Sequence, residues 1–204
     1  MSITNGYCTL AEIRGEIGIT DATDNTDDTR LERAVVAASR AIDNECGRRF
    51  YLDSAATARY FTAKESDYLR VDDIGTATGL IVATDSAGAR TYADTWASTD
   101  YDAEPYNALA DGWPITALQV TPQGSYSFPT LRKACKITAK WGWPSVPADI
   151  KTAAMIEAIR LYKRKDAPFG IMGSMETGLL TLPKLDPDVK LLIMPYRKMS
   201  IGGV

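Results

Sequence analysis

The sequence predicts an α+β protein, in which a helical bundle core carries an inserted antiparallel β-unit near residues 56–143. On either side of the insertion, apolar residues recur every three or four positions, as on one face of an α-helix. Inside it they alternate in twos and include many β-branched and aromatic residues, as in strands. The 204 residues, 45% of them hydrophobic, are enough to bury a core. We expect helices near residues 9–17, 29–46, 147–165 and 187–194, with residues 1–55 and 144–194 as the helical core and 195–204 as a C-terminal tail.

The first two helices have recognisable ends. Thr9 and Glu12 are spaced as a capping box ahead of an apolar face, and Gly18 supplies a stop. Gly47 follows the second helix and suits a left-handed C-cap. The apolar stripe of this second helix is rich in small side chains, which allow close helix packing. We expect the stripe either in the protein core or in an interface between copies: Leu31, Val35, Ala38 and Ile42.

The β-unit is expected to contain six strands, at residues 57–63, 67–74, 79–85, 89–96, 115–121 and 134–142. A short turn, Ser86-Ala87-Gly88, would join the third strand to the fourth. A longer loop containing Pro105 and Pro114 would join the fourth to the fifth. The aromatic residues near this loop allow two interpretations, half-buried packing or stacking on a sugar ring. They are Trp96, Tyr101, Tyr106 and Trp113.

Helical patterning resumes after the insertion. Pro147 is expected at the first helical position, and a wide apolar surface extends to Lys165. The basic run Lys163-Arg164-Lys165 is interpreted as a solvated helix end. A glycine- and methionine-containing stretch follows, from which we expect contacts with a partner: Phe169, Ile171, Met172 and Met175. A last short helix begins near Pro187 and is expected to end at Pro195.

Composition excludes several classes of protein. Histidine is absent, so neither a Ser-His-Asp triad nor a Cys-His dyad can form, and we expect no catalytic site. Cys8, Cys46 and Cys135 are widely spaced and are interpreted as small buried hydrophobes. The acidic loop Asp21–Glu32 has a threonine where a calcium loop needs glycine, so its carboxylates are interpreted as helix-capping residues. We expect no cofactor, no metal and no membrane association.

Charge is distributed unevenly along the chain. The net charge is −3, which argues against a protein that grips nucleic acid. Residues 1–55 contain ten acids and six bases, whereas residues 145–204 contain six acids and nine bases. The two ends of the chain therefore have opposite sign, which would suit head-to-tail contacts between neighbouring copies.

The most informative residues form a strand, a corner and a helix. KITAKWGWPSVPADIK (136–151) is followed by RLYKR (160–164) and DAPFGIMG (166–173). This order resembles the head-tail connector (adaptor, or head-completion) family of tailed bacteriophages. The early segment ERAVVAASRAID (32–43) and the ending LDPDVKLLIMPYRK (185–198) are also similar to that family. The inserted β-unit is a departure from its shortest, nearly all-helical members.

The resemblance implies a structural role in the virion. Members of the family form a ring, commonly of twelve copies, that binds the portal, extends the DNA channel and provides a platform for the next neck or tail protein. Double-stranded DNA would pass through the lumen without specific binding, and assembly would take place in the host cytoplasm. The resemblance assigns portal binding to the C-terminal tail: Pro195, Tyr196, Arg197, Lys198, Met199 and Ile201.

Two alternatives remain open at this stage. One is a neck stopper or tail-completion protein, a layer further from the capsid. The other belongs to a different class, a carbohydrate-binding module that uses the aromatic residues of the β-unit.

Overall fold

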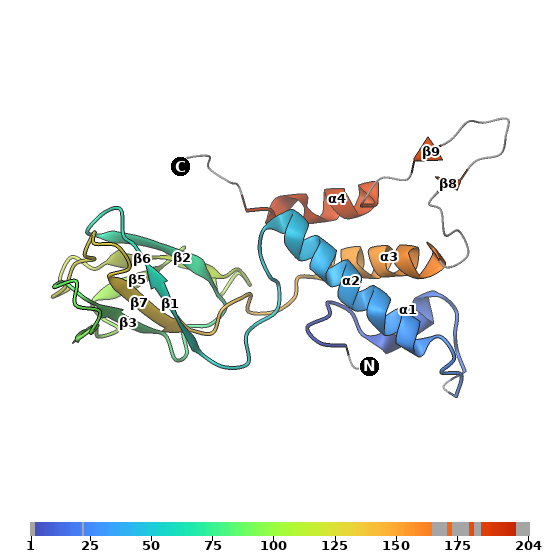
Figure 1. Ribbon diagram of the computed structural model, residues 1–204, viewed down its shortest axis with the longest axis horizontal. Coiled ribbons are helices and arrows are strands. Elements are labelled where there is room, and N and C mark those ends of the chain that lie inside the picture. Colours follow the sequence, from blue (N-terminus) through green and yellow to red (C-terminus); the bar gives the residue numbers. More distant parts are fainter. Residues whose placement is uncertain (1–2, 22, 165–170, 173–179, 182–184, 199–204) are drawn as a thin grey trace. The chain divides into compact units, whose positions relative to one another are not determined.

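The computed structural model describes residues 3–21, 23–164, 171–172, 180–181 and 185–198, and it has an α+β fold (Figure 1). The chain divides into two compact units. A helical unit consists of residues 1–50 and 146–204, and a β-unit consists of residues 51–145. The sequence placed the corresponding boundaries at 55/56 and 143/144.

The helical unit contains the four expected helices: α1 (Leu10–Glu16), α2 (Asp28–Cys46), α3 (Ala148–Lys163) and α4 (Pro187–Ile193). Helix α2 packs against α3, and α3 also packs against α4 and α1 (Figure 1). The predicted capping box is confirmed, since the Thr9 hydroxyl accepts from the Glu12 backbone N–H at 3.2 Å and the Glu12 carboxylate accepts from the Thr9 N–H at 2.8 Å. Gly47 ends α2 at a φ of 64°, as expected for a left-handed cap.

Three helix ends differ from the expectation. Pro147 is the N-cap of α3 rather than its first residue, because its ψ of 149° is extended. Helix α2 begins at Asp28, and its N-cap Asp27 forms no side-chain cap because its carboxylate accepts from the Tyr162 hydroxyl at 2.6 Å. Pro195 does not end the last helical segment, which continues as a 3-10 turn over Met194–Tyr196. A proline early in such a turn sacrifices no hydrogen bond, since the first N–H groups have no intrahelical partner.

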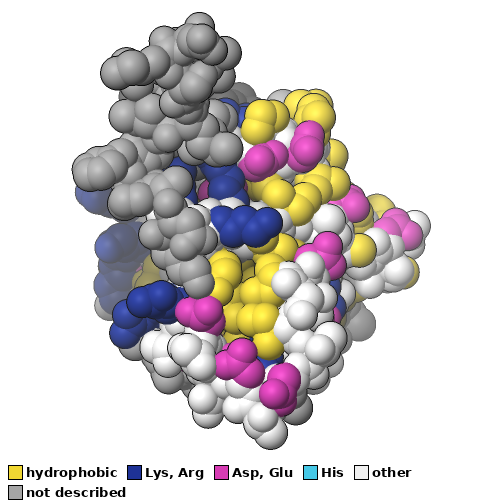
Figure 2. Space-filling model, turned by 90° about the vertical axis from the view of Figure 1, so that its right-hand side faces the viewer, with side chains coloured by type: hydrophobic (Ala, Val, Ile, Leu, Met, Phe, Trp, Pro, Cys, Tyr) yellow, Lys and Arg dark blue, Asp and Glu magenta, His cyan; other side chains and the backbone are white. Residues whose placement is uncertain are grey.

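The acidic segment between α1 and α2 is held by local contacts. The Arg14 guanidinium pairs with Asp28 at 3.0 Å and donates to the carbonyls of Asp21 and Asp24. The Asp21 carboxylate accepts from the Thr23 N–H at 2.8 Å. These carboxylates therefore organise the turn into α2. Figure 2 shows the side of the molecule on which α1 lies, where both acidic and basic side chains border a hydrophobic patch.

The predicted stripe of α2 lies in the interior of the helical unit. All four side chains are fully buried within the single chain: Leu31, Val35, Ala38 and Ile42. They pack where α2 meets α3, whose own buried residues include Ala153, Ala154 and Ala158. The small side chains on both helices permit this close approach. Since no part of the stripe is accessible, it forms core rather than a surface for a neighbouring copy.

The β-unit consists of two antiparallel sheets. The first has the order β1-β7-β3-β4 and the second β2-β6-β5. Their strands are β1 (Thr57–Phe61), β2 (Tyr68–Ile74), β3 (Ile81–Thr84), β4 (Asp94–Thr95), β5 (Tyr101–Glu104), β6 (Ile115–Val120) and β7 (Cys135–Ala139). Both sheets contribute to one hydrophobic core that includes Leu69, Leu118, Ile137 and Trp141. Strand β7 alternates between buried and half-buried residues, which confirms its predicted period of two.

Two predictions within the β-unit are wrong. The strand expected at 89–96 is reduced to Asp94–Thr95, because Arg90 and Tyr92 adopt positive φ and the buried Asp85 carboxylate accepts from the N–H groups of Ala89 and Arg90. The connection is thus a nine-residue loop (85–93) rather than a three-residue turn. Strand β5 was missed inside the expected loop; its sequence YDAE has low strand propensity, and it forms by pairing with β6.

The cysteines are buried, as predicted. Burial raises the pKa of each thiol from an ordinary value near 9 to about 11. The folded protein therefore holds these thiols protonated, and this contribution to stability is complete below pH 9 and is lost as the pH rises through 11.

We accordingly expect the three thiols to resist Ellman's reagent in the folded protein and to react at once in guanidinium. The urea concentration at half-unfolding should fall between pH 9 and pH 11. Rapid modification of any of the three in the folded protein would contradict their burial.

Candidate interaction surface at the C-terminal helix

Helix α4 has a buried face and an exposed apolar face. Val189 and Ile193 are fully buried, and they fix the helix against the rest of the helical unit. Leu191 and Met194 point the other way, with 69% and 64% of their surface exposed. Asp186 caps the helix by accepting from the Asp188 N–H at 2.9 Å. The second apolar face of this seven-residue helix is therefore a candidate interaction surface.

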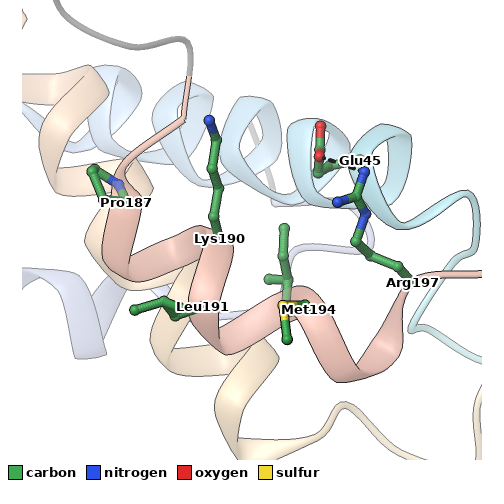
Figure 3. Close-up of a pocket in the computed structure, with 7 residues that line it drawn as sticks. Glu45, Pro187, Lys190, Leu191, Met194 and Arg197 are labelled. Carbon is green, nitrogen blue, oxygen red and sulfur yellow. Dashed lines mark ion pairs between the residues drawn. The ribbon is translucent and has the colours of Figure 1, made fainter.

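A shallow hollow of about 350 Å³ lies beside this exposed face (Figure 3). Its lining is mostly apolar, with charged side chains at the margin: Glu45, Pro187, Lys190, Leu191, Ile193, Met194 and Arg197. Glu45 comes from the last turn of α2 and pairs with Arg197 at 3.0 Å (Figure 3). Lys190 is the remaining charged residue of this lining. We call Lys190, Leu191 and Met194 the α4 ridge.

The residues after α4 are attached to α2, to the loop that follows it and to the first turn of α3. The Tyr196 ring packs edge-on against Phe50, with 5.8 Å between ring centroids. Its hydroxyl donates to Oδ2 of Asp149 at 3.0 Å, and the Lys198 N–H donates to the Cys46 carbonyl at 2.8 Å. Together with the Arg197–Glu45 pair, these contacts form an anchor (residues 196–198) that fixes where the chain leaves the helical unit.

The anchor rests on a buried polar pair that the sequence did not reveal. The Tyr7 hydroxyl donates to the Asp43 carboxylate and accepts from the Phe50 N–H at 2.9 Å. The Tyr7 ring also packs edge-on against Phe50. Burial raises the pKa of Tyr7 far above its ordinary value and also raises that of Asp43. Tyr7 thereby holds Phe50 in position to receive Tyr196. The sequence around Tyr7, a single tyrosine before the first helix, does not predict its contacts with Asp43 and Phe50.

The expected site residues fall into three groups. Pro195, Tyr196, Arg197 and Lys198 lie on the helical unit itself, and the side chains of Tyr196 and Arg197 contact other residues of this chain. Ile171 and Met172 form strand β8, which pairs with β9 (Leu180–Thr181), in a stretch where the sequence predicted no strand. Phe169, Met175, Met199 and Ile201 lie outside the described residues. The α4 ridge was missed, because the apolar residues of the sequence VKLLIM do not show which face of the helix is buried.

The aromatic residues of the β-unit do not gather into one exposed platform. Trp96 is only 5% exposed and stacks on Phe128 with 4.5 Å between centroids. Trp113 packs against Trp143, and Tyr106, although exposed, donates to Asp102 at 3.3 Å. The packing interpretation therefore holds for Trp96.

Metal-binding clusters and membrane-spanning helices are both absent from the described part of the chain. Within it, no three carboxylate or thiol groups converge in a way that could hold a metal ion. None of the helices described there combines the length and the apolar character of a membrane span.

Comparison with known proteins finds structural neighbours for this fold but no sequence family. A scan against protein-family models finds no match, and no curated protein matches the sequence. One solved structure, the neck of an empty gene transfer agent (GTA) particle computed with C6 symmetry, contains a chain with a TM-score of 0.58 and 16% identity. A second, the virion of a native gene transfer agent particle, contains a chain with a TM-score of 0.54 and 18% identity. Each match covers 100% of this chain and 96% of the other. The likeness shows that both units belong to one recurring fold.

Proposed function

We propose that this chain is a structural component of the neck of a phage-like particle, where its copies form the head-to-tail adaptor ring. The observation that carries the proposal is the extent of the structural likeness, which includes the helical unit and the β-unit and leaves almost none of the neck chain unmatched. The order of motifs at residues 136–173 supports the same role independently, through its resemblance to head-tail connectors.

The ring would bind the portal on its capsid side and present a platform to the next neck protein. Each copy needs only modest affinity for the portal, because once one copy has bound, the others bind as if intramolecularly. The net charge of −3 suits a channel through which DNA slides, since it offers little net attraction to phosphates. The function is mechanical and needs no catalytic group.

Portal binding would fall to the last residues of the chain. Because the 196–198 anchor is engaged with α2 and its following loop, we assign the contact to residues 199–204, which include Met199 and Ile201. The anchor would give each copy the same exit point, so that a ring presents a regular circle of tails.

A truncation after Lys198 tests this role. We expect the truncated protein to fold and unfold like the full chain, since the anchor is retained, but to fail to join DNA-filled heads to tails. The measurement is complementation of heads assembled without this chain, counted as infectious or transducing particles. A matched control is Arg197→Ala, which removes one exposed ion pair worth about 1 kcal/mol or less. It leaves the Tyr196 and Lys198 contacts of the anchor in place and should still complement. Full complementation by the truncated protein would contradict the role of the tail.

A further inference from the structure

The helical unit has a second hollow, on the side opposite α4. It has a volume of about 590 Å³ and lies along α1 and the turn that follows: Leu10, Ala11, Arg14, Gly15, Ile19, Thr20 and Asp21. An added Cβ at Gly15 would meet no atom within 4 Å, so the hollow is open at this residue. We call it the α1 hollow. Helices α2 and α3 lie between α1 and α4 (Figure 1).

The α1 hollow lies in the most acidic part of the chain. Residues 9–28 contain six acids and a single base, Arg14, giving a net charge of −5. The positive charge of Arg14 is largely compensated within the chain, because Arg14 pairs with Asp28 and donates to two backbone carbonyls. The side chains of Glu16 and Asp21 remain exposed in this part of the helical unit.

The α4 ridge is complementary to this hollow in shape and in charge. Leu191 and Met194 are largely exposed, and the space over Gly15 is open to receive an apolar side chain. Lys190 flanks the two apolar side chains, and the acid nearest to them in the lining, Glu45, is paired with Arg197. An apolar ridge with a cation therefore stands on one side of the unit, and an apolar hollow with an acidic border on the other.

We propose that the α4 ridge of one copy inserts into the α1 hollow of the next. This inference rests on the proposed ring, and it names the surfaces that join its subunits. Because the ridge and the hollow are different surfaces on opposite sides of one unit, the contact is heterologous, and repetition produces a closed ring when the rotation per copy divides a full turn. Lys190 faces the acidic border and sets the direction of insertion.

Cysteine cross-linking tests the contact. Particles are assembled with the double variant Gly15→Cys and Leu191→Cys and then oxidised; the native thiols are buried and do not compete. We expect a ladder of covalent multimers extending beyond the dimer. Either single variant should give monomers, and so should Ala37→Cys paired with Leu191→Cys, since Ala37 is exposed on α2 away from the hollow.

The outcomes separate this inference from the proposed function. If the double variant is present in particles but gives no multimers, the contact is wrong while the neck assignment stands. Dimers from Leu191→Cys alone would show a two-fold contact instead and would equally overturn it. If the chain is absent from particles, both proposals fail.

Filling the hollow provides a second test. Gly15→Trp should lose incorporation into particles and Gly15→Ala should keep it, while both variants fold because the site is open and helical. Normal incorporation of Gly15→Trp would contradict insertion of the ridge.

Discussion

Replacing Ala38 by glutamate is expected to unfold the helical unit. Ala38 is fully buried on the face of α2 that packs against α3, where neighbouring small residues leave no space for a longer side chain. The new carboxylate would be both overpacked and deprived of water, which costs on the order of 3–5 kcal/mol. Such a loss is comparable to the whole stability of a small domain.

The neighbouring position supplies the control. Ala37 is exposed on the same helix, between Arg33 and Arg40 at the helical spacings that favour ion pairs, so Ala37→Glu should leave stability within about 0.5 kcal/mol of the parent. Unfolding in urea followed by far-ultraviolet circular dichroism compares the two, since this signal is dominated by the helices. Equal unfolding midpoints for Ala38→Glu and Ala37→Glu would contradict the packing of α2.

Replacing Gly142 by alanine is expected to disrupt the β-unit. Gly142 has a φ of 116°, and an added Cβ would lie 1.8 Å from the Tyr51 carbonyl oxygen. Both the backbone conformation and the contact are forbidden to alanine, so the chain must move at this point. We expect a loss of about 3 kcal/mol or more.

Gly112→Ala is the matched control, because Gly112 also has a positive φ, 77°, but an added Cβ there meets nothing within 4 Å. It should cost only the conformational penalty of about 1–2 kcal/mol. Tryptophan fluorescence reports on this unit selectively, since all four tryptophans lie within residues 51–145. If Gly142→Ala lowers the free energy of unfolding no more than Gly112→Ala does, the backbone at Gly142 is not closely packed against Tyr51.

Gly142 also explains the physical basis of the WGWP motif on which the family resemblance depends. Trp141 and Trp143 are both buried in the β-unit, and the Trp141 indole N–H donates to the Thr57 carbonyl at 2.8 Å. Between them the backbone passes directly against Tyr51, which only glycine permits. The glycine of the motif is therefore required by the close approach of two backbone segments where the chain leaves β7.

Features set by neighbouring residues could be predicted from the sequence, and features set by distant ones could not. The capping box of Thr9 and Glu12 and the cap at Gly47 depend on residues within one turn, so their spacing was sufficient. Strand β5 depends on pairing with β6, and its own residues favour a loop. The 196–198 anchor depends on Phe50 and on Tyr7 beneath it, which are more than 140 residues away in sequence.

The same distinction applies to the candidate site. The resemblance to head-tail connectors drew attention to the tail, whereas the α4 ridge is defined by which face Val189 and Ile193 bury. On so short a helix, surrounded by apolar residues, periodicity does not separate the two faces. Only the packed structure shows that Leu191 and Met194 are left exposed.

The central claim is that this chain lies in the neck, and its position in the particle tests that claim most directly. The measurement is cryo-electron microscopy of purified particles that carry an electron-dense label on the N-terminus of this chain. We predict label density in a ring at the junction of head and tail, on the capsid side of the neck. Density one layer further towards the tail would assign the chain to a stopper instead, and density on the head surface or the tail fibres would contradict a neck role altogether.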